Sequence, residues 1–121
     1  VVVPVSRIPA LVARIRELSM ESGIPIVCFG HAGNGNLHVN LMYDQANPQQ
    51  MAAHDACLEG VFAATIALGG SLSGEHGIGL AKRDFVHLEL DADTRDAMHA
   101  VKAALDPDNI LNPDKGLPPR R

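Results

Sequence analysis

Two apolar runs flank a glycine-rich turn in the stretch Ile26-Val27-Cys28-Phe29-Gly30-His31-Ala32-Gly33-Asn34-Gly35-Asn36-Leu37-His38-Val39-Asn40-Leu41-Met42-Tyr43. If the chain reverses within residues 32–36, the two runs pair as strands. Side chains alternate across a strand, so His38 and Asn40 would share one face, toward the face that His31 occupies. The stretch therefore predicts a hairpin on which polar side chains converge.

Apolar residues at spacings of three and four predict a long helix on each side of this hairpin. The first is expected to begin at Ser6 as N-cap and to end at Gly23. The second is expected to begin at Asn47, because asparagine caps helices and a proline follows it, and to run to Gly69. Val1–Val5, before the first helix, is typical of a short strand.

The second half of the chain is expected to be mainly helical. Residues 80–90 have a helical pattern, and Asp91 is a suitable cap for a last helix over 92–105. Turn residues then surround an apolar pair in a packed loop. The side chains expected to face inward from these segments are Met98, Val101, Leu105, Ile110 and Leu111.

This order of elements predicts an α+β fold, in which an antiparallel sheet has helices packed on one face. A chain of 121 residues, 46% of them apolar, is long enough for one domain with a core and too short for two. The sheet is expected to be incomplete, and the chain opens with Val1 inside an apolar run. We therefore expect a fragment of a longer protein.

The composition argues against several classes of protein. Basic and acidic residues are interspersed and the formal net charge is -4, which argues against a nucleic-acid partner. No apolar run approaches the roughly 20 residues needed to cross a bilayer, so no transmembrane segment is expected. Cys28 and Cys57 lie in apolar segments, as reduced thiols do. We expect a soluble, cytoplasmic protein.

Two neutral imidazoles and one carboxylate are a common ligand set for a divalent metal that also binds substrate. His31 and His38 offer the imidazoles, and Glu75 in the loop Ser73-Gly74-Glu75-His76-Gly77-Ile78-Gly79 offers the carboxylate. The neighbouring His76 is a general-base candidate, because a nearby cation disfavours its protonation. The ligands meet only if folding brings the loop to the hairpin.

Other polar residues have simpler interpretations. Turn chemistry is the better interpretation for Asn34 and Asn36, whereas Asn40 is a candidate for ligand binding. Packing or solvation on a helix is the better interpretation for His54, His87, His99 and Lys82.

Three motifs together resemble the C-terminal part of FAD-linked oxidases of the vanillyl-alcohol-oxidase type. They are Gly30–Asn40, Ser73–Gly79 and the closing Asp106-Pro107-Asp108-Asn109-Ile110-Leu111-Asn112-Pro113, in that order. The resemblance spans nearly the whole chain. This family includes D-lactate dehydrogenases, the glycolate oxidase FAD subunit and D-2-hydroxyglutarate dehydrogenases.

The resemblance implies a metal site and a reaction. It implies that His31, His38 and Glu75 hold zinc or manganese, that Asn40 contacts the substrate, and that His76 contacts it and acts as base. A D-2-hydroxy acid would give its hydroxyl proton to that base and a hydride from C2 to the flavin. The product would be the 2-oxo acid.

The resemblance also implies that FAD is bound mainly by a domain N-terminal to this chain. Asn109 and Asn112 would lie near the flavin, and residues 1–121 would form a ferredoxin-like cap domain for substrate and metal. Basic residues that grip the substrate carboxylate would come largely from before Val1. The chain alone would therefore be inactive.

Two positions depart from the usual family pattern. Asn34 stands where aspartate is common, and Asp114 stands where glycine is common. Both are turn positions, so we expect the site to survive these changes.

Two alternatives remain open at this point. A complete protein of this length would be a small metal- or ligand-binding α+β module without redox chemistry. A metal hydrolase that activates water through Glu75 or His76 is a weaker alternative, because the motif spacing of zinc peptidases is absent. The sequence also leaves open the hydroxy acid, the metal, the electron acceptor and whether the chain forms a homo-oligomer.

Overall fold

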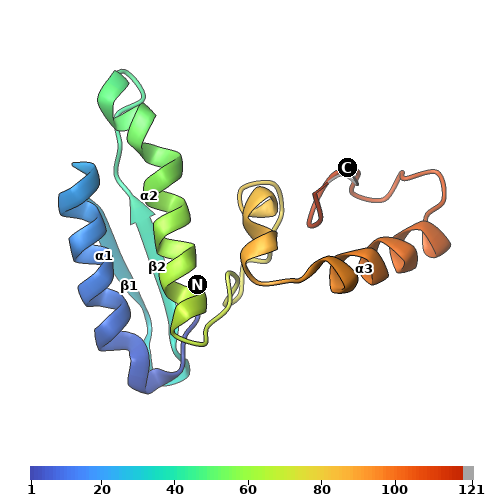
Figure 1. Cartoon of the computed structure of the whole chain (residues 1–121), viewed down its shortest axis with the longest axis horizontal. Helices are drawn as coiled ribbons and strands as arrows, with labels where there is room; N and C mark the ends of the chain where they lie inside the picture. Colours follow the sequence, from blue (N-terminus) through green and yellow to red (C-terminus); the bar gives the residue numbers. More distant parts are fainter. Residues whose placement is uncertain (119–121) are drawn as a thin grey trace. The chain divides into compact units, whose positions relative to one another are not determined.

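The computed structural model describes residues 1–118 and has an α+β fold, as the sequence predicts (Figure 1). Two compact units divide the chain, Val1–Glu75 and His76–Arg121. The first contains the hairpin and two long helices, and the second contains one long helix and a series of turns. Within residues 1–118, no helix is both long enough and apolar enough to cross a membrane.

The predicted hairpin is confirmed. Strands β1 (Ile26–His31) and β2 (Asn36–Leu41) pair in antiparallel, and the short 3-10 turn η2 (Ala32–Asn34) joins them. Gly35 ends this turn at a φ of 80°, in the left-handed region that glycine adopts without steric cost. Because successive side chains of a strand point to opposite sides, the hairpin has two faces. We call the face that packs on the helices the core face, and the face that carries His31 the open face.

Helices α1 (Ile8–Ser22) and α2 (Pro48–Ala67) lie side by side over the core face (Figure 1). Gly23 ends α1 in the left-handed conformation, and the Asn47 side chain caps α2 by accepting hydrogen bonds from two amides of its first turn. Both ends agree with the sequence prediction. The buried core consists of Val3, Leu11, Ile15, Leu18, Ile24, Leu37, Cys57 and Val61.

The start of α1 differs from the prediction. A 3-10 turn, η1 (Val5–Arg7), precedes the helix, so its N-cap is Arg7 rather than Ser6. Pro9 gives the physical reason, because a residue without an N–H is best accommodated where that group would have no helical partner.

Residues 80–90 do not form the predicted α-helix. They form turns and the 3-10 helix η3 (Arg83–Leu88). Asp84, Val86 and His87 all have low helix propensity, and a short helix with a single buried residue, Val86, is only marginally stable. Tight i→i+3 hydrogen bonds are the outcome for such a segment.

The last helix, α3 (Ala92–Leu105), begins at Asp91, whose carboxylate accepts a hydrogen bond from the Thr94 amide, as predicted. The side chains predicted to face inward are exposed, however. Within residues 76–118 the buried residues are Val86 and Asp106, because one helix and a set of turns enclose little volume. The exposed side chains are Met98, Val101, Leu105, Ile110 and Leu111.

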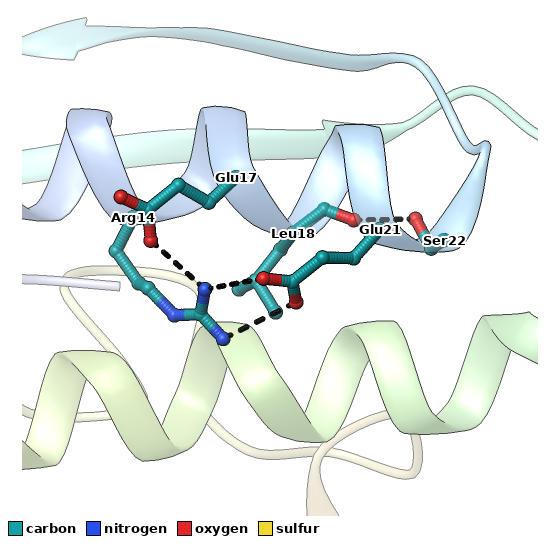
Figure 2. A network of polar contacts seen from close by, with 5 residues as sticks. All are labelled: Arg14, Glu17, Leu18, Glu21 and Ser22. Atoms are coloured by element: carbon teal, nitrogen blue, oxygen red, sulfur yellow. Dashed lines mark hydrogen bonds and ion pairs between the residues drawn. The ribbon is translucent and has the colours of Figure 1, made fainter.

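Figure 2 shows a surface network on α1. The Arg14 guanidinium donates hydrogen bonds of 2.9 Å to Glu21 and to Glu17, and these contacts raise its pKa above the ordinary value. All three side chains are exposed, so water and salt screen the ion pairs. The next residue, Ile15, is only 2% exposed and packs in the core.

We expect Ile15→Ala to lower the free energy of unfolding by about 2–5 kcal/mol, because it removes buried methyl groups and leaves a cavity. The matched control Arg14→Ala should lower it far less, because its ion pairs are screened. Urea unfolding followed by circular dichroism measures both values. Equal losses would contradict the view that the buried side of α1 holds the helix in place.

Candidate metal centre

Three side chains predicted as metal ligands converge at one end of the hairpin. His31 is the last residue of β1, His38 lies in β2, and Glu75 lies in the loop that follows α2. The Glu75 Oε1 atom lies 3.1 Å from Nε2 of His38 and 4.0 Å from Nε2 of His31. One ligand atom from each residue lies within 4.8 Å of the others. Folding therefore brings the loop to the hairpin.

The donor set fits a divalent cation. Imidazole nitrogen and carboxylate oxygen bind zinc at about 2.0–2.2 Å, so two ligands of a tetrahedral site lie about 3.4 Å apart. The spacing of His38 and Glu75 is close to this value, and a side-chain rotation of His31 would complete the set. The His31 side chain is 61% exposed and that of Glu75 is 44% exposed, so water or substrate has access to the remaining coordination positions.

The strand register explains why both histidines lie on the open face. Phe29 is paired with His38 and His31 with Asn36, and directly paired residues point to the same side of a sheet. Asn40, the predicted substrate contact, is exposed on this face two residues beyond His38. The prediction that these polar side chains share a face is confirmed.

The N-terminal segment positions the loop that carries Glu75. The predicted strand Val1–Val5 is reduced to Val2, which bridges to Asn36 on one side and to Ser71 on the other. Val2 and Ser71 exchange backbone hydrogen bonds of 3.1 and 2.9 Å. This segment therefore lies between β2 and the loop, and it ties one to the other.

Asn36 has a structural role that the turn interpretation missed. It is the first residue of β2 and is buried, 5% exposed. A Cβ on Gly74 would lie only 2.1 Å from the Asn36 Oδ1 atom. A side chain at position 74 would have to displace the buried Asn36 amide, and Glu75 is the next residue. Local sequence patterns contain no signal for such a contact between distant segments.

Asn34 is a turn residue, as predicted. Its Oδ1 atom accepts a hydrogen bond of 3.2 Å from the Asn36 amide. An aspartate offers the same acceptor, so asparagine at this position keeps the contact.

His54, His87 and His99 join no group of metal-ligating side chains within residues 1–118. His54 Nδ1 lies 2.9 Å from the Asp55 carboxylate, and His87 Nδ1 lies 2.8 Å from the Asp84 carbonyl oxygen. The His54 ring also packs against the Tyr43 ring, with centroids 4.3 Å apart. Local contacts and packing therefore account for both histidines, in agreement with the sequence analysis. Lys82 is half-buried rather than fully solvated, and burial lowers its pKa.

Three predicted site residues lie in the second unit. His76 begins this unit and directly follows Glu75 in the chain. Asn109 and Asn112 have φ values of 51° and 47°, in the left-handed region that asparagine tolerates better than most residues. Asp114, at a φ of 60°, also lies there, which explains why glycine suits that position.

Asp106 organises the loop that contains these asparagines. Its carboxylate accepts hydrogen bonds of 3.0 Å from the Ile110 amide and 2.9 Å from the Leu111 amide, and another from Lys102 Nζ. The contact with Lys102 is the main cause that lowers the pKa of Asp106, and the two amides act in the same direction. The sequence predicted turn chemistry here without identifying the carboxylate at its centre.

Comparison with known proteins identifies the family of this chain. The sequence profile of FAD linked oxidases, C-terminal domain, matches residues 1–116. The chain belongs to this family.

Relatives of this FAD-linked oxidase domain include oxidoreductases named for several hydroxy acids. The glycolate oxidase subunit GlcD of Bacillus subtilis (strain 168) is 42% identical over 93% of this chain and 24% of its own length. The mitochondrial D-lactate dehydrogenase [cytochrome] of Kluyveromyces lactis is 37% identical over 95% of this chain and 19% of its own length. A probable mitochondrial D-2-hydroxyglutarate dehydrogenase of Oryza sativa subsp. indica is 34% identical over 96% of this chain and 20% of its own length. The chain thus spans a quarter or less of these relatives.

For the loop of this oxidase domain, we expect Asp106→Asn to weaken protection of the Ile110 and Leu111 amides from hydrogen exchange. An amide side chain keeps one acceptor oxygen but turns an N–H group toward a backbone donor, and it loses the charge that pairs with Lys102. NMR on the whole chain measures the exchange rates. Unchanged protection at neutral pH would contradict this role.

The same loop should respond to acid. The folded-state pKa of Asp106 lies below its ordinary value of about 3.9. Its contribution is therefore complete above that value and is lost as the pH falls through the lower, folded-state pKa. The Asp106→Asn variant should not show this acid-dependent step in its Ile110 and Leu111 amide shifts.

Proposed function

We propose that residues 1–121 form the substrate- and metal-binding C-terminal domain of a flavin-dependent dehydrogenase. Its substrate would be a D-2-hydroxy acid of the lactate, glycolate or 2-hydroxyglutarate class, and its product the 2-oxo acid. Family membership and the names of the relatives support this proposal. A separate FAD-binding domain, N-terminal in the full-length protein, would be the main partner.

The main structural support for the proposal is the arrangement of three side chains. His31, His38 and Glu75 come from three different elements, yet their ligand atoms gather within 4.8 Å at an exposed site. Two nitrogens and one carboxylate oxygen suit zinc or manganese and leave coordination positions for a substrate. A hydroxy acid has the hydroxyl and carboxylate oxygens to fill those positions.

The chemistry is divided among the residues of this chain. When bound, the divalent metal supplies polarisation of the substrate hydroxyl, and FAD supplies the acceptor for the C2 hydride. His76 accepts the hydroxyl proton on an imidazole nitrogen, and the Asn40 side-chain amide orients the substrate on the open face. Asn109 and Asn112 would contact the flavin from the loop that Asp106 organises.

The cellular location is also part of the proposal. Cys28 and Cys57 form no disulfide, which supports a reducing compartment, and we propose the cytoplasm.

We expect the purified full-length protein to contain about one divalent ion per chain, and His31→Ala to lose most of it, because one of three protein ligands is removed. Elemental mass spectrometry measures the content. The matched control is His54→Ala, which removes a histidine that contacts Asp55 and the Tyr43 ring and belongs to no group of candidate metal ligands in the described residues. Equal metal content in the wild-type protein and His31→Ala would contradict the ligand assignment.

We expect His76→Ala in the FAD-loaded protein to slow flavin reduction by D-lactate, or by a longer 2-hydroxy acid, about 10²–10⁴-fold, the range typical of a general base. Metal content should stay unchanged. Stopped-flow flavin absorbance gives the rate, with His87→Ala as the control. Unaltered reduction in His76→Ala would remove its role as base, and a protein that binds metal but no flavin would favour the small-module alternative.

A further inference from the structure

We propose that Phe29 is a positioning residue for His38, holding its imidazole so that Nε2 faces Glu75. This inference rests on the proposed function, because it concerns a ligand of the same metal centre. It assigns a role to a side chain that does not itself offer a ligand atom.

The contact between the two rings is direct. Phe29 and His38 are paired across β1 and β2, so their side chains leave the sheet next to each other on the open face. Their ring centroids lie 5.0 Å apart with the planes inclined by 31°, which is a tilted arrangement. The phenyl ring therefore covers one side of the imidazole.

The other neighbours of His38 leave its ring little freedom. The His31 ring meets it edge-on, with centroids 5.6 Å apart and planes at 76°. The Glu75 carboxylate lies 3.1 Å from Nε2. The His38 ring thus contacts Phe29 and His31 while its Nε2 atom faces Glu75. Phe29 thus restricts the imidazole to the orientation that the metal centre requires.

Burial in the core does not explain an aromatic residue at this position. Phe29 is 55% exposed and points away from the helices, whereas its neighbour Cys28 packs on the core face. A large apolar side chain that stays half in water contributes only part of its hydrophobic stabilisation. Its contact with His38 gives it a local role instead.

Val27 offers a matched control. It lies on the same strand and the same face, is 49% exposed, and is paired with Asn40 instead of His38. Truncation of either residue removes exposed apolar surface next to a polar partner. Of these two residues, Phe29 is the one whose ring contacts a candidate metal ligand.

The test is a titration of the metal-free, full-length protein with Zn²⁺ alone. We expect Phe29→Ala to raise the zinc dissociation constant about three- to tenfold, the range that one aromatic pair contributes. Phe29→Tyr keeps the ring and should restore wild-type affinity, and Val27→Ala should leave the affinity unchanged. Wild-type affinity in Phe29→Ala would overturn the inference while the metal centre stands. Failure of the wild-type protein to bind zinc would instead contradict the proposed function.

A second measurement needs no variant and no metal. In the apo protein, the ring current of Phe29 should displace the His38 imidazole proton resonances from those of an exposed histidine. NMR of selectively labelled histidine reports these shifts. His38 resonances at exposed-histidine positions in the wild-type protein would overturn the inference even if Phe29→Ala failed to fold.

Discussion

The register between β1 and β2 determines where the candidate ligands stand. Leu37 is buried against the helices, and His38, one residue further, points to the open face. A slip of one residue would exchange these sides, placing an imidazole in the core and a leucine in water. Apolar burial on one face of the hairpin therefore fixes the polar arrangement on the other. The candidate metal centre depends on the burial of Leu37 as much as on its own three side chains.

Contacts of neighbouring residues tie the loop that carries Glu75 to the hairpin. Val2 bridges β2 and Ser71, and Gly74 lies so close to Asn36 that a side chain on it would collide with the Asn36 amide group. The contact of Gly74 thus holds the backbone directly before Glu75, the residue that carries the carboxylate. A ligand set drawn from separate elements needs such a tie, because an unanchored loop would lose conformational entropy on binding an ion.

The two units are stabilised by different kinds of interaction. Apolar side chains from α1, α2 and the hairpin form the core of the first unit. In the described part of the second unit, a buried carboxylate, Asp106, gathers two backbone amides and a lysine. Its hydrogen bonds offset the cost of burying a charge. The same bonds set the loop that presents Asn109 and Asn112.

The sequence by itself determined the three long helices, the hairpin and the face shared by His31 and His38. Caps, helical periodicity and strand alternation are local properties, so neighbouring residues are enough to reveal them. Only the tertiary structure decided that Glu75 meets these histidines, that Asn36 is buried, and that Met98 stays exposed. Those outcomes depend on which distant segments pack together and how much volume they enclose, and no local pattern of residues specifies that.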